Sequence, residues 1–148
     1  MQRLSGSTIG FWLITTLLPA AGCDRGGETL VPVEGKVTIA GEPLTAGAVS
    51  FRPDRNAGNS SLHHPTGPID AEGNYRLFVG QRAGAPPGSY QVVVFANEPA
   101  EDEQGAVHPG MPKTLIDRRY NAPETTPLSA KVQLDAETQF DFDLEPAR

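Results

Sequence analysis

From residue 30 onward the sequence alternates apolar and polar residues in short runs that end at glycine or proline, and this pattern constrains the fold most. Side chains of a β-strand point to opposite faces in turn, so a period of two predicts strands with one buried face. The chain has 16 glycines and 14 prolines among 148 residues, enough to end each run after a few positions. No stretch repeats with the 3.6-residue period of a helix, so we expect an all-β domain.

The alternation divides the chain into seven or eight predicted strands and the turns between them. The run YQVVVFA has no polar face and is expected in the centre of a sheet, covered on both sides. Gly35 interrupts the inner row of the first strand and is expected to mark a β-bulge. Strands are expected at 31–39, 48–53, 68–71, 75–79, 90–96, 115–120, 128–134 and 140–145. Seven or eight short antiparallel strands favour a single β-sandwich with Greek-key connections.

The last predicted strand has one apolar and one acidic face. The two rows are Phe140, Phe142 and Leu144, and Asp141, Asp143 and Glu145. The apolar row is expected to pack in the core and the acidic row to face water. Tyr90 and Tyr120 are each expected to bury the ring in the core and to hydrogen-bond the hydroxyl to a turn.

The first 22 residues have the layout of a secretory signal peptide. Arg3 gives a positive start, residues 9–18 form an apolar run, and residues 19–22 are small or helix-breaking. The apolar run is too short to span a bilayer as a helix. A buried N-terminal helix is the alternative, although the run lacks the polar face of an amphipathic helix.

Cys23, the only cysteine of the chain, directly follows these small residues. The sequence Ala-Ala-Gly-Cys resembles the bacterial lipobox, in which the thiol receives a diacylglycerol and cleavage leaves the cysteine as the new N-terminus. Ala20 stands where leucine is commonest in that motif. We expect lipidation at Cys23, with two or three acyl chains giving a stable anchor in a membrane of the bacterial cell envelope. Simple cleavage that leaves a free thiol is the alternative.

Residues 23–30 are polar and glycine-rich and are expected to form a flexible tether. At about 15 Å this tether would hold the domain close to the membrane, facing the periplasm or the exterior. Asp24 follows the cysteine directly, a position that indicates retention in the inner membrane in well-studied bacteria. The formal net charge is −6 and no basic patch is present, which argues against nucleic-acid binding.

Several blocks, taken in order, resemble the carboxypeptidase regulatory-like, transthyretin-like domain of bacterial lipoproteins. The blocks are VEGKVTI, GEPL and AVSF (33–51), DAEGNY (70–75), GAPPGSYQV (84–92) and RYNAPETTPL (119–128). Ile69 stands where that family usually has threonine. The resemblance implies a prealbumin-like β-sandwich over residues 31–146, secreted and lipid-anchored, with no established catalytic residues.

Two loops are the candidate interaction sites, because loops on a rigid sandwich carry most recognition. The first loop, residues 97–114, is longer than an ordinary connection and has no periodicity. Its candidate residues are Glu98, Glu101, Asp102, Glu103 and His108. The second loop, residues 54–65, carries His63 and His64.

These features predict a non-enzymatic, lipid-anchored module that binds an envelope protein or a glycan and needs no cofactor. No serine has a G-x-S-x-G context, so no nucleophile elbow is predicted. The alternative is a metal-binding protein or metal-dependent enzyme that uses the loop histidines and acidic residues. Adjacent side chains in an extended strand point apart, which argues against His63 and His64 sharing one ion. The acidic loop residues also lack EF-hand spacing.

Overall fold

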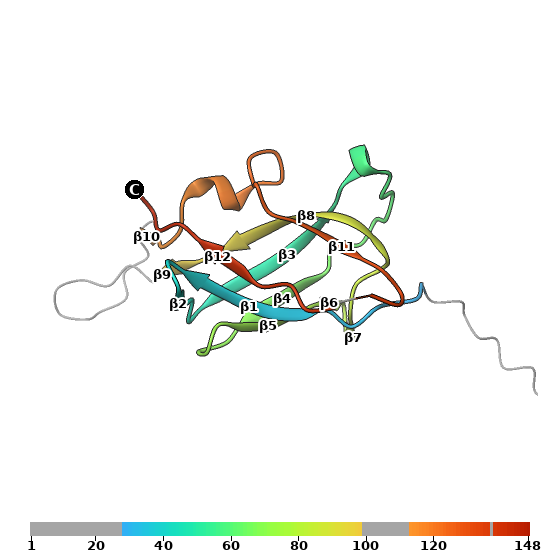
Figure 1. Ribbon diagram of the computed structural model, residues 1–148, viewed down its shortest axis with the longest axis horizontal. Coiled ribbons are helices and arrows are strands. Elements are labelled where there is room, and N and C mark those ends of the chain that lie inside the picture. Colours follow the sequence, from blue (N-terminus) through green and yellow to red (C-terminus); the bar gives the residue numbers. More distant parts are fainter. Residues whose placement is uncertain (1–27, 99–112, 137) are drawn as a thin grey trace, which may run out of the picture.

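The computed structural model describes residues 28–98, 113–136 and 138–148, and within them the protein is all-β (Figure 1). The strands are β1 (Glu34–Ile39), β2 (Glu42–Pro43), β3 (Gly47–Pro53), β4 (Thr66–Ile69), β5 (Asn74–Arg76), β6 (Phe78–Val79), β7 (Arg82–Ala83), β8 (Gly88–Phe95), β9 (Asn97–Glu98), β10 (Lys113–Thr114), β11 (Ser129–Val132) and β12 (Phe142–Leu144). Two 3₁₀ turns, η1 (Arg55–Ala57) and η2 (Arg118–Asn121), complete the described elements. The predicted all-β class is therefore confirmed.

One curled sheet contains most of these strands. Its main path runs β11-β8-β3-β4-β5-β1-β12, with β2 on β1 and the β6–β7 hairpin on β4, while β9 and β10 form a separate pair. Neighbours on the main path are antiparallel except β1 and β12, which are parallel. The expectation of antiparallel strands throughout is wrong at this pair, because residues 133–141 carry the chain from the β11 edge of the sheet to the β12 edge.

Aromatic contacts across the sheet show how strongly it curls. Strands β3 and β12 lie four places apart, which corresponds to roughly 19 Å in a flat sheet. The ring of Phe51 in β3 nevertheless lies 6.0 Å from that of Phe140 and 6.5 Å from that of Phe142, measured between centroids. The sheet must therefore fold back over itself, and these rings fill the space that it encloses.

The enclosed core follows the alternation that the sequence predicts. In β1 and its lead-in, Val31, Val33 and Val37 are buried, as expected of one strand face. Strand β8 lies between β3 and β11, and consecutive valines Val92, Val93 and Val94 are at most 1% exposed, which confirms the prediction of a central strand covered on both faces.

The structure corrects the prediction of a strand at 115–120. Here η2 begins after Asp117, whose side chain accepts a hydrogen bond from the amide of Arg119. A short side-chain acceptor at this position satisfies a free amide at the start of a helical turn, so it favours a turn over a strand. Tyr120 buries its ring as expected, and its hydroxyl accepts hydrogen bonds from the Arg119 side chain of η2 at 2.8 Å and from the Glu145 amide at 3.3 Å. Tyr90 does bond as expected, to the Pro86 carbonyl at 2.7 Å.

The structure also corrects two details of the alternation. Gly35 pairs in register with Tyr75, so it marks no bulge. The pattern of residues 128–134 ends early: β11 stops at Val132, and Leu134 lies in the following turn with 61% of its surface exposed. A period of two persists in the sequence here for two residues after the strand itself has ended.

The acidic face of the last strand holds β12 to its neighbours. The Asp141 carboxylate accepts from the Lys36 amide at 2.8 Å. The Asp143 carboxylate accepts from the Thr38 hydroxyl at 2.6 Å and from the Gly41 amide at 2.9 Å. These bonds occupy backbone and hydroxyl donors along β1 and the turn after it, so the acidic row does more than face water.

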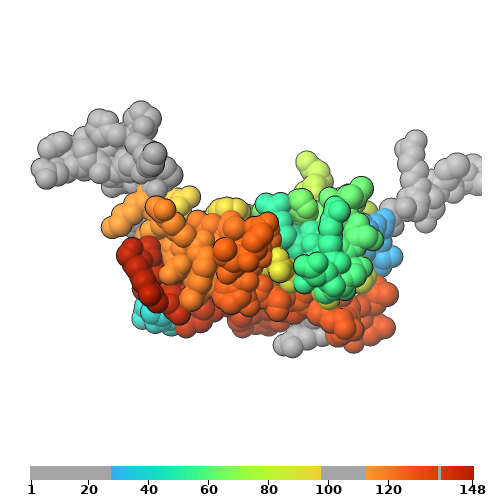
Figure 2. Space-filling view, turned by 90° about the horizontal axis from the view of Figure 1, so that it is seen from above, coloured from blue at the N-terminus to red at the C-terminus, as the bar shows by residue number. Residues whose placement is uncertain are grey.

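Different segments of the chain lie at the two ends of the domain (Figures 1 and 2). The chain enters at one end, where Glu28 lies beside the loop of residues 54–65 and near the turn of residues 133–136; we call this the entry end. Strands β9 and β10 and the C-terminal residues lie at the opposite end, which we call the far end.

Candidate functional site

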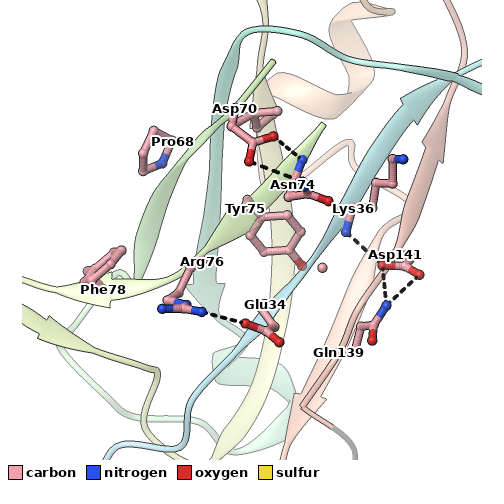
Figure 3. A pocket seen from close by; sticks show the side chains of 12 residues that line it. Glu34, Lys36, Pro68, Asp70, Asn74, Tyr75, Arg76, Phe78, Gln139 and Asp141 are labelled. Carbon is pink, nitrogen blue, oxygen red and sulfur yellow. Dashed lines mark hydrogen bonds and ion pairs between the residues drawn. The ribbon is translucent and has the colours of Figure 1, made fainter. Parts of the chain in front are cut away.

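A groove of about 650 Å³ crosses the outer face of strands β4, β5 and β1 (Figure 3). Its charged and polar side chains come from alternate positions that point away from the core, because successive residues of a strand face opposite sides. Those side chains are Glu34, Lys36, Asp70, Asn74, Arg76, Gln139 and Asp141, with Pro68 and Phe78 as apolar parts of the wall.

The floor of the groove is fixed by Tyr75 and Gly35. A Cβ at Gly35 would lie 1.9 Å from the Phe140 carbonyl oxygen and 3.0 Å from the Tyr75 ring, so only glycine fits between them. Tyr75 stands opposite Gly35 in the strand register and donates its hydroxyl hydrogen to the Phe140 carbonyl at 2.7 Å. Burial, followed by the nearby Asp141 carboxylate, raises the pKa of Tyr75, so the phenol stays neutral. Tyr75 therefore serves as a structural floor and is unsuited to act as a base.

The charged groups of the groove mostly bond to each other and to the backbone. Glu34 and Arg76 form an ion pair at 3.1 Å, with both side chains more than half exposed. The Gln139 amide nitrogen lies 3.2 Å from a carboxylate oxygen of Asp141. Asp70 accepts from the amides of Glu72 and Asn74 in the β4–β5 turn. Desolvation is the largest single effect and disfavours its charged form, but the hydrogen bonds from Asn74 and its neighbours together outweigh it and lower the pKa of Asp70.

The groove contains groups suited to binding. Its described lining has no histidine, cysteine, serine or threonine, and the nucleophile types that it does contain are a lysine amine and carboxylates that are already ion-paired or hydrogen-bonded. It offers donors, acceptors and two apolar walls in an open trough, which an extended polar chain would fit. The sequence placed Glu34 and Lys36 outward correctly, but the hollow itself depends on the approach of residues 139–141, which no local pattern indicates.

The two adjacent histidines of the 54–65 loop diverge. The His63 Nε2 lies 3.4 Å from the Glu28 carboxylate, whereas the His64 Nδ1 lies 2.7 Å from a guanidinium nitrogen of Arg52. Partial burial and then the charges of Arg52 and Arg55 lower the pKa of His64, which keeps its ring neutral at pH 7. A neutral His64 can accept the Arg52 hydrogen at Nδ1. The two rings thus lie against different partners, in agreement with the prediction that these adjacent side chains point apart.

The first candidate loop is described only at its base. Glu98 belongs to β9, which pairs with β10, and its partner in register is Lys113. Glu101, Asp102, Glu103 and His108 lie outside the described residues, as does Cys23. Within the described ranges, no three His, Cys, Asp or Glu side chains are grouped closely enough to hold a metal ion. The metal-binding alternative, which involves residues beyond those ranges, stays a prediction.

A second hollow lies where β10 meets η2, close to the base of that loop. It measures about 750 Å³, and the residues lining it include three basic side chains and one acid, Lys113, Arg118, Arg148 and Asp117. The Asn121 side-chain oxygen next to it is buried without a partner among the described residues. This basic surface was missed in the sequence, because its residues are separated by up to 35 positions.

Comparison with known proteins adds no family to these observations. No family model, no curated protein and no solved structure matches the chain. In the part of the chain that the structure describes, no helix is long and apolar enough to cross a bilayer.

Proposed function

We propose that this protein is a non-catalytic, lipid-anchored module of the bacterial cell envelope that binds a partner, first a protein and second a glycan, at its far end. The observation that carries the proposal is the placement of the two ends. The chain that follows Cys23 enters the domain at one end, while the β9–β10 pair from which residues 99–112 extend lies at the other (Figure 1). An anchor at Cys23 would thus turn the far end away from the membrane.

The fold that we propose is a prealbumin-like β-sandwich. Seven strands on the main path, the return of the β12 edge over β3, and a single enclosed core are consistent with two packed layers. The sequence blocks at 33–51, 70–75, 84–92 and 119–128 support the same family.

Binding is favoured over catalysis by what the described surfaces contain. The described lining of the outer groove has no histidine, cysteine, serine or threonine, and most of its charged groups form ion pairs or hydrogen bonds within the domain. The far end carries the basic hollow, and the sequence that joins β9 to β10 contains acidic residues, so charges of both signs are available to select a partner by complementarity.

The anchor is tested by changing Cys23→Ser in the full chain and separating membranes from soluble protein. The unchanged protein is expected in the membrane fraction and the variant in the soluble fraction, because the thioether cannot form without the thiol. A matched control, Ser5→Ala, alters the leader but keeps Cys23 and should remain with the membranes. Unchanged membrane partitioning of a normally processed Cys23→Ser protein contradicts the anchor.

Partner binding at the far end is tested by position-specific photo-crosslinking in the native cell. A photoreactive residue at exposed Asn97 or Arg118 is expected to yield one discrete adduct, and the same residue at Gln81 near the entry end is the control. Deleting residues 99–110 should leave the thermal unfolding curve intact and remove the adduct at both far-end positions. An adduct that appears equally at Gln81 places the binding site away from the far end. An adduct at Arg118 that survives the deletion shows that the partner does not need residues 99–110.

A further inference from the structure

Two leucines stand out at the entry end because the fold leaves them in water. Leu62 is 83% exposed and Leu134 is 61% exposed, the two highest values among large hydrophobic residues in the described ranges. Both belong to segments at the end where the chain enters the domain (Figures 1 and 2). A single exposed leucine is ordinary. Contact with the membrane would explain why two exposed leucines lie at one end, beside the proposed membrane tether.

The loop that carries Leu62 is held in place by its own hydrogen bonds. The Asn59 side chain donates to the Ser89 carbonyl at 2.9 Å and accepts from the Ser61 amide at 3.0 Å. The next residue, His63, is directed to Glu28. These contacts lie on both sides of Leu62 and hold the loop in a conformation that leaves its side chain exposed.

The turn that carries Leu134 lies against the same loop. Leu134 lines a shallow hollow of about 440 Å³ together with Gly58 and Asn59. The strand before it ends at Val132, which places Leu134 outward although the sequence alternation would place it inward. Leu134 therefore borders the same loop that carries Leu62, at the entry end.

The length of chain before the domain limits where this surface can be. Only five residue steps separate Cys23 from Glu28, a reach of at most about 17 Å when fully extended. From Glu28 onward the chain is fixed: its carbonyl accepts from Arg82 at 3.0 Å, and Val31 exchanges two backbone hydrogen bonds of 2.9 Å with Ala85. A lipid chain on Cys23 would therefore keep the entry end within a short distance of the bilayer.

The charges at the entry end are of both signs. Arg55, Arg82 and Lys131 are exposed there, and so are the acidic Glu28 and Asp135. Attraction to anionic headgroups is weak in such a case, because the acids are repelled while the basic side chains are attracted. Apolar contact, added to the tether, is the force that remains.

We propose that the entry end rests on the lipid surface, with Leu62 and Leu134 inserted between the headgroups. The inference rests on the proposed anchor and adds to it a fixed orientation of the domain. The tether brings the surface to the bilayer, and the two leucines stop the domain from tumbling about the tether. The far end, with its loop base and basic hollow, then points into the aqueous compartment.

The test uses the full lipidated protein in vesicles. Because the Cys23 thiol is consumed by the thioether, one added cysteine can be labelled specifically with a fluorophore. Ser60→Cys reports on the entry end and Asn97→Cys on the far end, and both positions are exposed and keep the leucines intact. The vesicles contain phosphatidylcholine with nitroxide groups at the headgroup, which quench nearby fluorophores.

We expect loss of fluorescence at position 60 and none at position 97, with the same result when phosphatidylglycerol is included. In the background Leu62→Asp with Leu134→Asp, the quenching at position 60 should fall to the value at position 97, whereas Phe95→Asp, at an exposed far-end residue, should leave it unchanged. Quenching that is equal at both positions, or that survives the double change, overturns the orientation while leaving the anchor intact. Failure of the protein to float with vesicles overturns the anchor and, with it, this inference.

Discussion

The centre of the sheet and its last strand are held together by different forces. Strands β3 and β8 pair over six residues, and Phe51 and Tyr90 pack their rings 5.6 Å apart between them. Strand β12 pairs with β1 over only three residues and relies on carboxylates that bond to β1 donors and to Arg119. The pair of β3 and β8 is held by backbone pairing and by apolar side chains, so its stability does not depend on charged groups. The attachment of the last strand depends on carboxylates, which lose their charge in acid.

The difference teaches how the domain closes. The carboxylate of Glu145 lies 2.7 Å from the Arg119 guanidinium, which in turn stacks over the Tyr120 ring at 4.8 Å and donates to its hydroxyl. These side chains join the end of the chain to η2, which packs against β8. The last strand thus closes the fold through polar contacts at its edges and aromatic contacts at Phe140 and Phe142.

The largest expected effect comes from Phe51→Ala, because Phe51 touches both regions. Its ring contacts Tyr90 in the centre and Phe140 and Phe142 in the last strand, and it is fully buried. Removing a buried phenylalanine ring costs about 3–5 kcal/mol of the free energy of unfolding. Denaturant unfolding followed by tyrosine fluorescence measures this loss. The control Phe95→Ala, at a ring that keeps 38% of its surface exposed, should lose clearly less stability than Phe51→Ala. Similar losses in both variants would contradict the central position of Phe51.

The next largest effect is expected from Gly35→Ala, which acts mainly on the segment that leads into the last strand. The new Cβ would meet the Phe140 carbonyl and the Tyr75 ring, so residues 138–140 must move away from β1. Overpacking of this kind lowers the free energy of unfolding by about 1–3 kcal/mol or more.

In the control Gly41→Ala the new Cβ has open space and only a strained positive φ, so the free energy of unfolding should fall by about 1 kcal/mol. Hydrogen exchange should rise at Phe140, whose amide bonds to Glu34, and stay unchanged at β8 amides. Exchange that rises equally in β8 would mean that the two regions do not unfold separately.

The sequence predicts the centre of the sheet better than its edge, for a physical reason. A buried strand such as β8 leaves a local apolar signal, and the turn at Asp70–Asn74 leaves a local Asp-Gly-Asn signal, so both follow from neighbouring residues. The parallel pairing of β12, the approach that requires Gly35, and the groove at Glu34 and Arg76 join residues about 40 to 105 positions apart. No periodicity reports on such contacts, because the sheet must curl before they exist.

A smaller loss of stability is expected from Asp143→Asn, which preserves shape and removes charge. The carboxylate accepts from the Thr38 hydroxyl and the Gly41 amide, and a neutral amide oxygen accepts these hydrogens more weakly. The melting temperature at pH 7 should fall by less than in Gly35→Ala, since the group is exposed and screened by water. Asp135→Asn, in an exposed turn, is the control and should leave the melting temperature unchanged. A fall in Asp135→Asn as large as in Asp143→Asn would mean that overall charge, and not this contact, matters.

The smallest and most specific effect is on the pH dependence of stability. The Thr38 hydroxyl and the Gly41 amide lower the pKa of Asp143, and the Arg119 guanidinium lowers the pKa of Glu145, so the folded protein binds fewer protons than the unfolded chain in acid. The stabilisation that they give is present above about pH 4, the range of unperturbed carboxyl groups, and is lost as the pH falls through their lowered values. Stability should therefore fall between about pH 4 and pH 2, and the slope of that fall should be shallower in Asp143→Asn than in Asp135→Asn.

Because the central pair contains no titrating group in this range, amides of β12 and of the Gly41 turn should lose hydrogen-exchange protection at a higher pH than amides of β8. Simultaneous loss at β8 and β12 would show that acid unfolds the domain as one unit, and that the carboxylates fasten the whole fold and not its last strand.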